Sequence, residues 1–329
     1  MSKKETQEKF KTMIGGQALI EGIMMRGPEK DAIVVRTADG IQVETTPRKI
    51  RPKGSFATWP FVRGAVGFFD AQVTGVKALM RSADLSPEES QEEPSKFDQW
   101  LEKKLGSKKF QSFLVGTAVA LGLGMSILLF FILPEIIVDL FSRWIPGNLL
   151  QNLVKGVVRI AIFVGYMLLV SRMKEMKRVF SYHGAEHKTI RCYEAQLPLT
   201  VENVRKQTRK HPRCGTSFLF VVMILSILIF SVATELLVLI PGLAVLDGTI
   251  LFKVIMILLK LLLLPVVVAF AFEINRFVGR HDNWFTRILT APGMWFQNFT
   301  TFEPDDEMIE VGIASLEAVL PEEEGTDRW

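Results

Sequence analysis

Hydrophobic positions are concentrated in four long runs, which are separated by polar and charged segments. The runs cover residues 113–133, 153–170, 218–240 and 251–272. About 20 apolar residues are needed to cross the hydrocarbon core of a bilayer, so each run is long enough or nearly long enough to do so. The pattern predicts an α-helical polytopic membrane protein with four transmembrane helices.

Three of these runs contain charged residues, which are costly inside a bilayer unless they are paired. Lys260 lies near the middle of the last run, about 14 Å from its outer end, and Glu235 lies about 8 Å from the outer end of the third run, a difference that a lysine stem can cover. We therefore expect Lys260 to pair with Glu235 on a neighbouring antiparallel helix, while Arg159 of the second run competes for the same carboxylate. Such residues either hold helices together or line a polar pathway or substrate contact.

The segment before the first run predicts a small β unit followed by a helix. Residues 15–28 predict a short strand edged by glycines, and residues 32–45 predict a hairpin that turns at Asp39-Gly40. Apolar residues recur at helical spacing over 60–80, which predicts an amphipathic helix that faces either a core or the membrane interface. Residues 1–83 are therefore expected to form one N-terminal part, which the charge distribution described below places in the cytoplasm.

The remaining segments complete the expected domain organisation. An acidic linker and a lead-in helix occupy 84–110, and the membrane domain occupies 111–275, with a histidine- and cysteine-containing loop at 172–217. Residues 283–299 are rich in Trp and Phe and contain Pro292-Gly293, which predicts two short interfacial helices. A terminal helix over 305–320 and an acidic tail complete the C-terminal part, 276–329.

The distribution of charge predicts the orientation. The loop 172–217 holds eleven Lys or Arg residues, whereas segment 241–250 holds none. Because basic loops stay on the cytoplasmic side, both termini and this loop are expected in the cytoplasm, with the protein in the plasma membrane. The first hundred residues contain no secretory signal, and two cysteines in a reducing compartment do not predict a disulfide.

The net charge of +4 conceals an asymmetry, because residues 303–329 contain ten acidic residues and one arginine. The rest of the chain is correspondingly basic. A basic cytoplasmic face fits anionic lipid headgroups, or a nucleic-acid-rich partner such as the ribosome. The positive-inside bias of membrane proteins accounts for the same charge without any partner.

The chemistry-bearing residues cluster in the central loop. His183 and His187 are one helical turn apart with Glu186 between them, which is the H-x-x-E-H pattern of inverted zincins. In that pattern the histidines hold a divalent metal, here expected to be zinc, and Glu186 acts on its bound water. Glu194, His211 and Cys214 are the candidates for the remaining ligands. The alternative is that the histidines form structural hydrogen bonds and the cysteines pack as small apolar residues.

Five motifs together resemble the bacterial YqhQ family (domain of unknown function 1385). They are GGQALIEGIMMRGP, YHGAEHKTIRCYE, LTVENVR, HPRCGTSFLF and PGMWFQNFTTFEP, and the resemblance extends over residues 15–304. The family is described as multi-pass membrane proteins predicted to be metal-dependent enzymes. The resemblance implies that His183, Glu186, His187, His211 and Cys214 occupy family motif positions.

Two functions of different classes follow from these observations. The first is a metal-dependent enzyme, hydrolase-like, that acts on an amide or ester at the cytoplasmic face of the inner membrane, with Glu186 as general base. The second is a non-catalytic membrane factor that binds a ribosome, a translocon or another membrane protein through its basic face. A homo-oligomer is compatible with both, and specific DNA binding is not expected.

Overall fold

The structure is a computed structural model that describes residues 10–48, 52, 54–86, 106–240, 249–323 and 325–328. The chain divides into two compact units. The first, which we call the site unit, comprises Met1–Ser86, Met167–Leu225 and Leu264–Trp329. The second, the span unit, comprises Pro87–Tyr166 and Ser226–Leu263.

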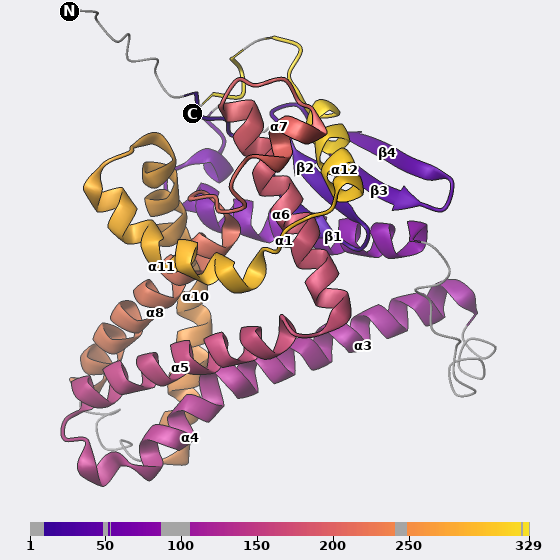
Figure 1. Ribbon diagram of the computed structural model, residues 1–329. Helices are drawn as coiled ribbons and strands as arrows, with labels where there is room; N and C mark the ends of the chain where they lie inside the picture. The colour runs from indigo at the N-terminus through magenta and orange to yellow at the C-terminus, as the bar shows by residue number, and fades with distance from the viewer. Residues whose placement is uncertain are drawn as a thin grey trace, which may run out of the picture. The chain divides into compact units, whose positions relative to one another are not determined.

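The site unit begins with a four-stranded antiparallel sheet in the order β1-β2-β3-β4 (Figure 1). The strands are β1 (Gly15–Leu19), β2 (Gly22–Arg26), β3 (Lys30–Thr37) and β4 (Gly40–Pro47). The predicted hairpin over 32–45 is confirmed as β3 and β4, whereas segment 15–28 forms two strands rather than one. A two-residue turn separates them, and Glu21 takes a left-handed conformation there (φ 52°). Gly22 follows the turn because a Cβ would lie 2.3 Å from the Val34 carbonyl oxygen.

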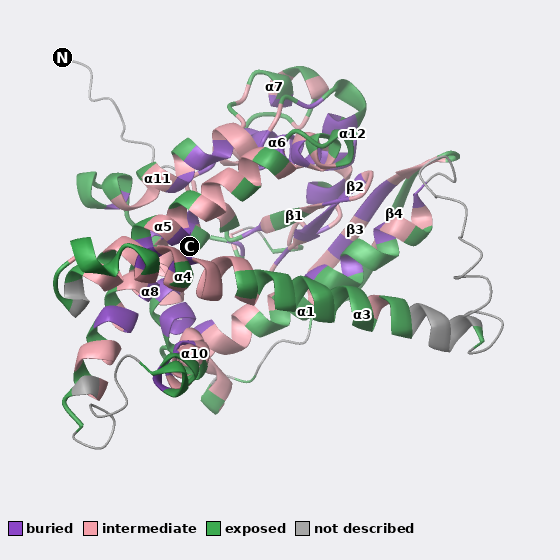
Figure 2. Cartoon of the chain, turned by 90° about the horizontal axis from the view of Figure 1, so that it is seen from below, coloured by how far each residue is buried: buried purple, intermediate pink, exposed green. Residues whose placement is uncertain are grey.

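Helices cover both faces of this sheet. Ile23 and Met25 of β2 pack on one side against Tyr182 of α6 (Lys174–Glu194) and Val311 of α12 (Asp306–Glu317). On the other side, Met24 packs with Ala78 of α1 (Val62–Leu85). This alternation along β2 is the reason that the strand is buried almost throughout, as Figure 2 shows.

Helix α1 has one packed face and one exposed apolar face, so its packed face bears out the core-facing alternative of the sequence. The residues that it buries all have small side chains or none: Gly64, Gly75, Ala78 and Ser82. Its larger apolar residues are exposed: Phe69, Val73, Val76, Leu79 and Met80. A short helix precedes it at Phe56–Thr58. Gly75 allows close approach to Gln17 of the sheet, and Gly64 allows close approach to Phe272. The exposed apolar face has the composition of an interfacial helix.

Four helical segments are long and apolar enough to cross a membrane, which confirms the expected polytopic fold. They are Phe113–Leu140, Leu150–Val170, Gly215–Leu237 and Ile250–Arg280. The first consists of α3 (Ser107–Ile127), a π-helical turn (Leu128–Ile132) and α4 (Leu133–Leu140), followed by a short helix at Ser142–Trp144. The others belong to α5 (Asn148–Val170), α8 (Gly215–Val238) and α10 (Ile250–Arg280).

The first span is longer than predicted, and this changes the charge pairing in the span unit. The helix continues through Pro134 to Leu140, so Glu135 lies within the span. Glu135 forms ion pairs with both Lys260 and Lys155. The expected pairing of Lys260 with Glu235 is therefore wrong, because Lys260 has a nearer acid on the first span.

The other two intramembrane groups also differ from expectation. Arg159 donates through Nε to the Phe130 carbonyl oxygen at 2.6 Å and lies over the ring of Phe131. It does not compete for Glu235, whose buried Oε1 has no hydrogen-bond partner among the described residues. At the end of the first span, Asp139 pairs with Lys253 at 2.5 Å.

Two helices of the central loop, α6 and α7, position the site. A break at residues 171–173 separates α5 from α6, so the motif helix is not a continuation of the second span. Helix α7 (Val201–Arg205) is capped by Thr200, whose Oγ1 accepts a hydrogen bond from the Asn203 amide at 3.3 Å.

The C-terminal part corrects one prediction and confirms another. Segment 283–299 forms one continuous helix, α11 (Trp284–Thr300), rather than two short helices. A capping box between Asn283 and Thr286 starts it, and Gly293 packs so closely on Ser217 that a Cβ would lie 2.3 Å from the Ser217 Cα. Pro292 costs this helix one backbone hydrogen bond without ending it. The predicted terminal helix is confirmed as α12, with Asp305 as its cap.

Asp327, near the C-terminal end of the described residues, contacts Thr12, near their N-terminal end. The Thr12 hydroxyl donates to Asp327 Oδ2 at 2.6 Å, and the Tyr193 hydroxyl donates to the same oxygen at 3.2 Å. Phe10 packs edge-on against Tyr193. Residues 1–9 and most of the acidic linker lie outside the described residues.

Candidate metal centre

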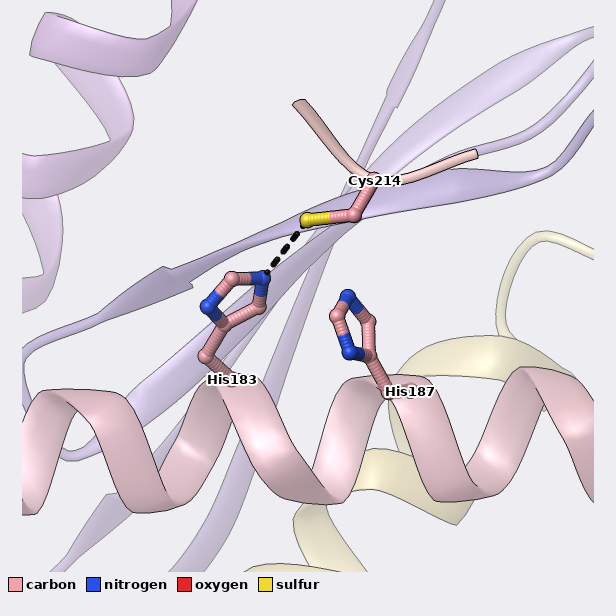
Figure 3. Close-up of side chains that lie close together, drawn as sticks. All are labelled: His183, His187 and Cys214. Carbon is pink, nitrogen blue, oxygen red and sulfur yellow. Dashed lines mark hydrogen bonds between the residues drawn. The ribbon is translucent and has the colours of Figure 1, made fainter. Parts of the chain in front are cut away.

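Helix α6 presents the H-x-x-E-H residues within the site unit. His183 and His187 project from successive turns of one face, and their ring centroids are 4.4 Å apart (Figure 3). This part of α6 is covered by the sheet and α12, so Glu186 and His187 are buried. The local sequence alone fixes the pairing of the two imidazoles, because a helix places residues four apart side by side.

Cys214 is the third member of this group, and it comes from the residue that precedes α8. Its sulfur lies 3.1 Å from His183 Nε2, as the dashed line in Figure 3 shows. The Thr216 amide and hydroxyl lie 3.5 and 3.4 Å from the same sulfur and donate to it. The sulfur is thus held as a hydrogen-bond acceptor and is directed at the histidines.

The ligand atoms of His183, His187 and Cys214 all lie within 4.8 Å of one another. A tetrahedral zinc ion with Zn–N distances of about 2.0–2.1 Å and Zn–S distances of about 2.3 Å separates its ligand atoms by roughly 3.3–3.6 Å. Small side-chain adjustments would close the observed set to that size. Three protein ligands of this kind leave one coordination position open, as in catalytic zinc sites.

Hydrogen bonds to backbone carbonyls fix the tautomers of both histidines. His183 Nδ1 is 2.8 Å from the Thr300 carbonyl oxygen, and His187 Nδ1 is 2.6 Å from the Arg209 carbonyl oxygen. A carbonyl oxygen can only accept, so each Nδ1 carries the proton and each neutral ring has its lone pair on Nε2. This is the outer-shell arrangement that metal-binding histidines adopt in proteins.

The unpartnered Nε2 of His187 supports the same interpretation. It is buried and has no hydrogen-bond partner among the described residues, although buried polar atoms are nearly always paired. A metal ion bound between His183, His187 and Cys214 would use this lone pair. The residues present therefore fit a divalent ion with nitrogen and sulfur ligands.

Glu186 lies beside this group and is 5% exposed. Its Oε1 accepts a hydrogen bond from the Gly16 amide of β1 at 3.0 Å, and its Oε2 is 3.8 Å from His183 Nε2. Burial raises the pKa of Glu186, while His183 and the Gly16 amide oppose the rise. A carboxyl with a raised pKa can hold or release a proton nearer to neutral pH than an exposed one.

Glu194 and His211, the other candidate ligands, form a separate hydrogen-bonded set. His211 Nε2 is 3.4 Å from Glu194 Oε2, and Glu194 also pairs with Arg213 and accepts from the Thr12 amide. Burial lowers the pKa of His211 to about 3, with Arg213 adding to the effect. The pKa of Glu194 is lowered by His211 and Arg213 despite its burial. Of the five candidate ligands, the group whose ligand atoms come together among the described residues is His183, His187 and Cys214.

The second cysteine takes no part in the centre. Cys192 is buried against Val204 and Ile309, and burial raises the pKa of its thiol. Its sulfur lies 3.6 Å from the Pro198 carbonyl oxygen. This residue fits the alternative that the sequence left open, a cysteine packed as a small apolar residue.

A cavity of about 700 Å³ gives access to the three ligand residues and to Glu186. Strand β1 forms one wall of it through Gly15–Ala18, and Leu219 and Phe272 contribute apolar surface. Three arginines, Arg26, Arg48 and Arg213, also line it. The N-terminal β unit thus closes over the histidine motif, a point on which the sequence was silent.

Sequence reasoning did not identify the groups that orient the ligands. The carbonyls of Thr300 and Arg209 and the amide of Gly16 are backbone atoms, so residue type gives no signal for them. Gly16 does carry a structural signal, because a Cβ there would lie 2.7 Å from the Met24 carbonyl oxygen and 3.0 Å from Glu186 Cγ. The glycine-rich motif at the start of the chain therefore allows β1 to approach Glu186.

Comparison with known proteins agrees with the motif resemblance. The sequence profile described as "Protein of unknown function (DUF1385)" matches residues 59–322, a range that includes all three ligand residues. The "Uncharacterized protein YqhQ" of Bacillus subtilis (strain 168) is 33% identical over 321 residues, which cover 96% of this chain and 94% of that protein. No solved structure matches the chain. The chain therefore belongs to the DUF1385 family, as its motifs led us to expect.

Proposed function

We propose that this protein is a metal-dependent enzyme of the hydrolase type, which acts at the cytoplasmic face of the plasma membrane. The observation that carries the proposal is the convergence of His183 Nε2, His187 Nε2 and Cys214 Sγ, with both Nδ1 atoms held by backbone carbonyls. A structural zinc site is normally closed by four protein ligands, whereas three ligands beside a cavity favour catalysis.

Each residue of the site has its own role in the proposed reaction. His183, His187 and Cys214 would hold the ion, and a zinc-type ion there supplies Lewis-acid polarisation and makes a bound water more acidic. Glu186 is the proton acceptor, since its carboxylate lies 3.8 Å from a ligand histidine and is held in place by the Gly16 amide. Gly16 thereby positions the carboxylate, and β1 limits the access of bulk water to it.

The location at the membrane surface rests on chain order and charge. Cys214 immediately precedes the span Gly215–Leu237, and α6 follows the span Leu150–Val170 after a three-residue break. The site therefore lies at the common end of two spans. The eleven basic residues between them favour the cytoplasmic side.

A second enzymatic arrangement is supported by the 3.1 Å contact between Cys214 Sγ and His183 Nε2. A cysteine beside a histidine that is oriented by a third group is the arrangement of cysteine nucleophiles. This alternative leaves the unpartnered His187 Nε2 unexplained, and so we favour the metal site. Alkylation of Cys214 by iodoacetamide distinguishes the two: a metal-held sulfur is protected until a chelator is added, whereas a free nucleophile reacts without one.

The substitution Glu186→Gln tests the enzymatic proposal. We expect the variant to retain the metal content of the wild type, because Glu186 is not in the ligand set, and to lose hydrolysis of chromogenic amide and ester substrates. It should also fail to restore the function of the intact gene in a deletion strain. Glu202→Gln, which changes an exposed pair with Lys206, is the matched control. Full function of Glu186→Gln would instead favour the non-catalytic membrane factor that binds a ribosome, translocon or other membrane protein.

A further inference from the structure

A second cavity in the site unit, of about 360 Å³, is distinct in character from the cavity of the metal centre. The end of α10 contributes Val278 to it, and α11 contributes Thr286 and Thr290. Its charged lining residues are Lys11, Arg191, Arg213, Arg287 and Asp282. Four cationic side chains and one carboxylate thus line the cavity, where Arg287 pairs with Asp282 at 3.1 Å and Arg213 pairs with Glu194.

Arg191 has the properties of an anion-binding arginine. Among the described residues, the only hydrogen bond of its side chain runs from Nε to the Lys210 carbonyl oxygen, at 2.8 Å. This bond fixes the plane of the guanidinium and leaves its two terminal nitrogens for a ligand. Burial lowers the pKa of Arg191, and the nearby charge of Arg213 adds to this, while Glu194 opposes it. An anion in the cavity would relieve the repulsion between the two arginines.

The position of the cavity in the chain indicates the source of the anion. The fourth span ends at Arg280, so Val278, His281 and Asp282 lie at the level of a membrane surface. Helix α11, which continues the cavity wall, exposes Trp284 (73%) and Ile288 (60%). Exposed tryptophan beside basic residues at the end of a span is typical of the headgroup region.

We propose that this basic cavity binds the phosphate group of an anionic phospholipid. Arg191 and Arg287 supply the charge-assisted hydrogen bonds, and Arg213 supports them from the wall that the two cavities share. The apolar face of α11 contacts the acyl region of the same leaflet. Because Arg213 lines both cavities, the bound headgroup lies next to the cavity of the metal centre.

Native mass spectrometry of the full-length protein in mild detergent tests the proposal. The probes are dioleoylphosphatidylglycerol, dioleoylphosphatidylcholine and inorganic phosphate. We expect the anionic lipid to bind in preference to the zwitterionic one, and Arg191→Gln and Arg287→Gln each to weaken its binding about tenfold. Arg280→Gln removes the same charge from an exposed residue at the same end of α10 that does not line the cavity, and it should change binding by less than about twofold.

Several results would overturn the proposal. Equal loss of binding in Arg280→Gln would show a diffuse basic surface rather than a site. Binding of inorganic phosphate that depends on Arg191, without preference for the anionic lipid, would identify a soluble phosphate compound as the ligand. Arg287 is largely exposed, so its variant should unfold at the wild-type temperature and remain informative if Arg191→Gln misfolds. Metal content should be the same in all these variants, which separates this test from that of the metal centre.

Discussion

Gly184 lies on α6 at the contact that holds the ligand histidines in place. A Cβ at this position would lie 2.0 Å from the Phe302 carbonyl oxygen and 3.5 Å from Pro304 Cδ. Phe302 is tied to α6 by the hydrogen bond from its amide to the Phe180 carbonyl oxygen, at 2.9 Å. The substitution Gly184→Ala must therefore push segment 300–304 away from α6 by more than ~1 Å to restore ordinary van der Waals distances.

Two opposing effects set the stability of this variant. Overpacking of a close contact lowers the free energy of unfolding by ~1–3 kcal/mol. Alanine has a higher helix propensity than glycine, which raises the free energy of unfolding by up to ~1 kcal/mol. We expect a net loss of ~1–2 kcal/mol. The same displacement moves the Thr300 carbonyl, which holds His183 Nδ1 at 2.8 Å. Loss of such an outer-shell partner typically weakens metal binding by about 10- to 100-fold.

Thermal unfolding in detergent and competition with a graded series of chelators measure the two effects. Gly67→Ala is the matched control, because Gly67 also lies within a helix and its nearest neighbour to an added Cβ is Phe272 Cε2, at 4.0 Å. It should leave metal affinity unchanged and should not lower stability. If Gly184→Ala retains metal as firmly as Gly67→Ala does, the Thr300 carbonyl does not orient His183 and the reasoning fails.

Two further predictions concern other parts of the chain. Glu135→Gln removes the acid shared by Lys155 and Lys260 and should destabilise the protein by ~3–5 kcal/mol, whereas Glu235→Gln should change stability by less than ~0.5 kcal/mol. Equal losses of stability for the two variants in unfolding titrations would contradict the pairing with Glu135 and support the pairing of Lys260 with Glu235. For His211, burial lowers the pKa from 6.5 to about 3, so the folded state resists a proton that the unfolded chain accepts. The contribution of neutral, buried His211 to the free energy of unfolding is present above pH 6.5 and is lost as the pH falls toward 3. His211→Asn should flatten this part of the curve of stability against pH, and an unchanged slope would contradict the assignment.

The parts of the fold that the sequence predicted depend on local patterns. The four spans follow from runs of apolar residues, and the β3–β4 hairpin follows from alternation around Asp39-Gly40. The Thr200 cap of α7 is likewise local, because its hydroxyl accepts from an amide only three residues away. The pairing of His183 with His187 is of the same kind, since helical geometry alone brings the two rings together.

The parts that the sequence did not predict depend on contacts between distant segments. Glu135 was overlooked because the first span was expected to end at Leu133, although the apolar residues after Pro134 continue the same helix. Pro292 suggested a break in α11 that the packing of Gly293 on Ser217 makes unnecessary. Nothing in the spacing of the motif could choose Cys214 over Glu194, because that choice depends on which segment folds onto α6.

The central claim is that His183, His187 and Cys214 hold a divalent metal ion. Elemental analysis of the purified full-length protein, beside the variants His183→Ala, His187→Ala and Cys214→Ser, tests it most directly. The account predicts about one zinc-type ion per wild-type chain and a large loss in each of the three variants, with Cys192→Ser at the wild-type level. Wild-type protein without a stoichiometric transition metal, or variants that retain it in full, would contradict the account.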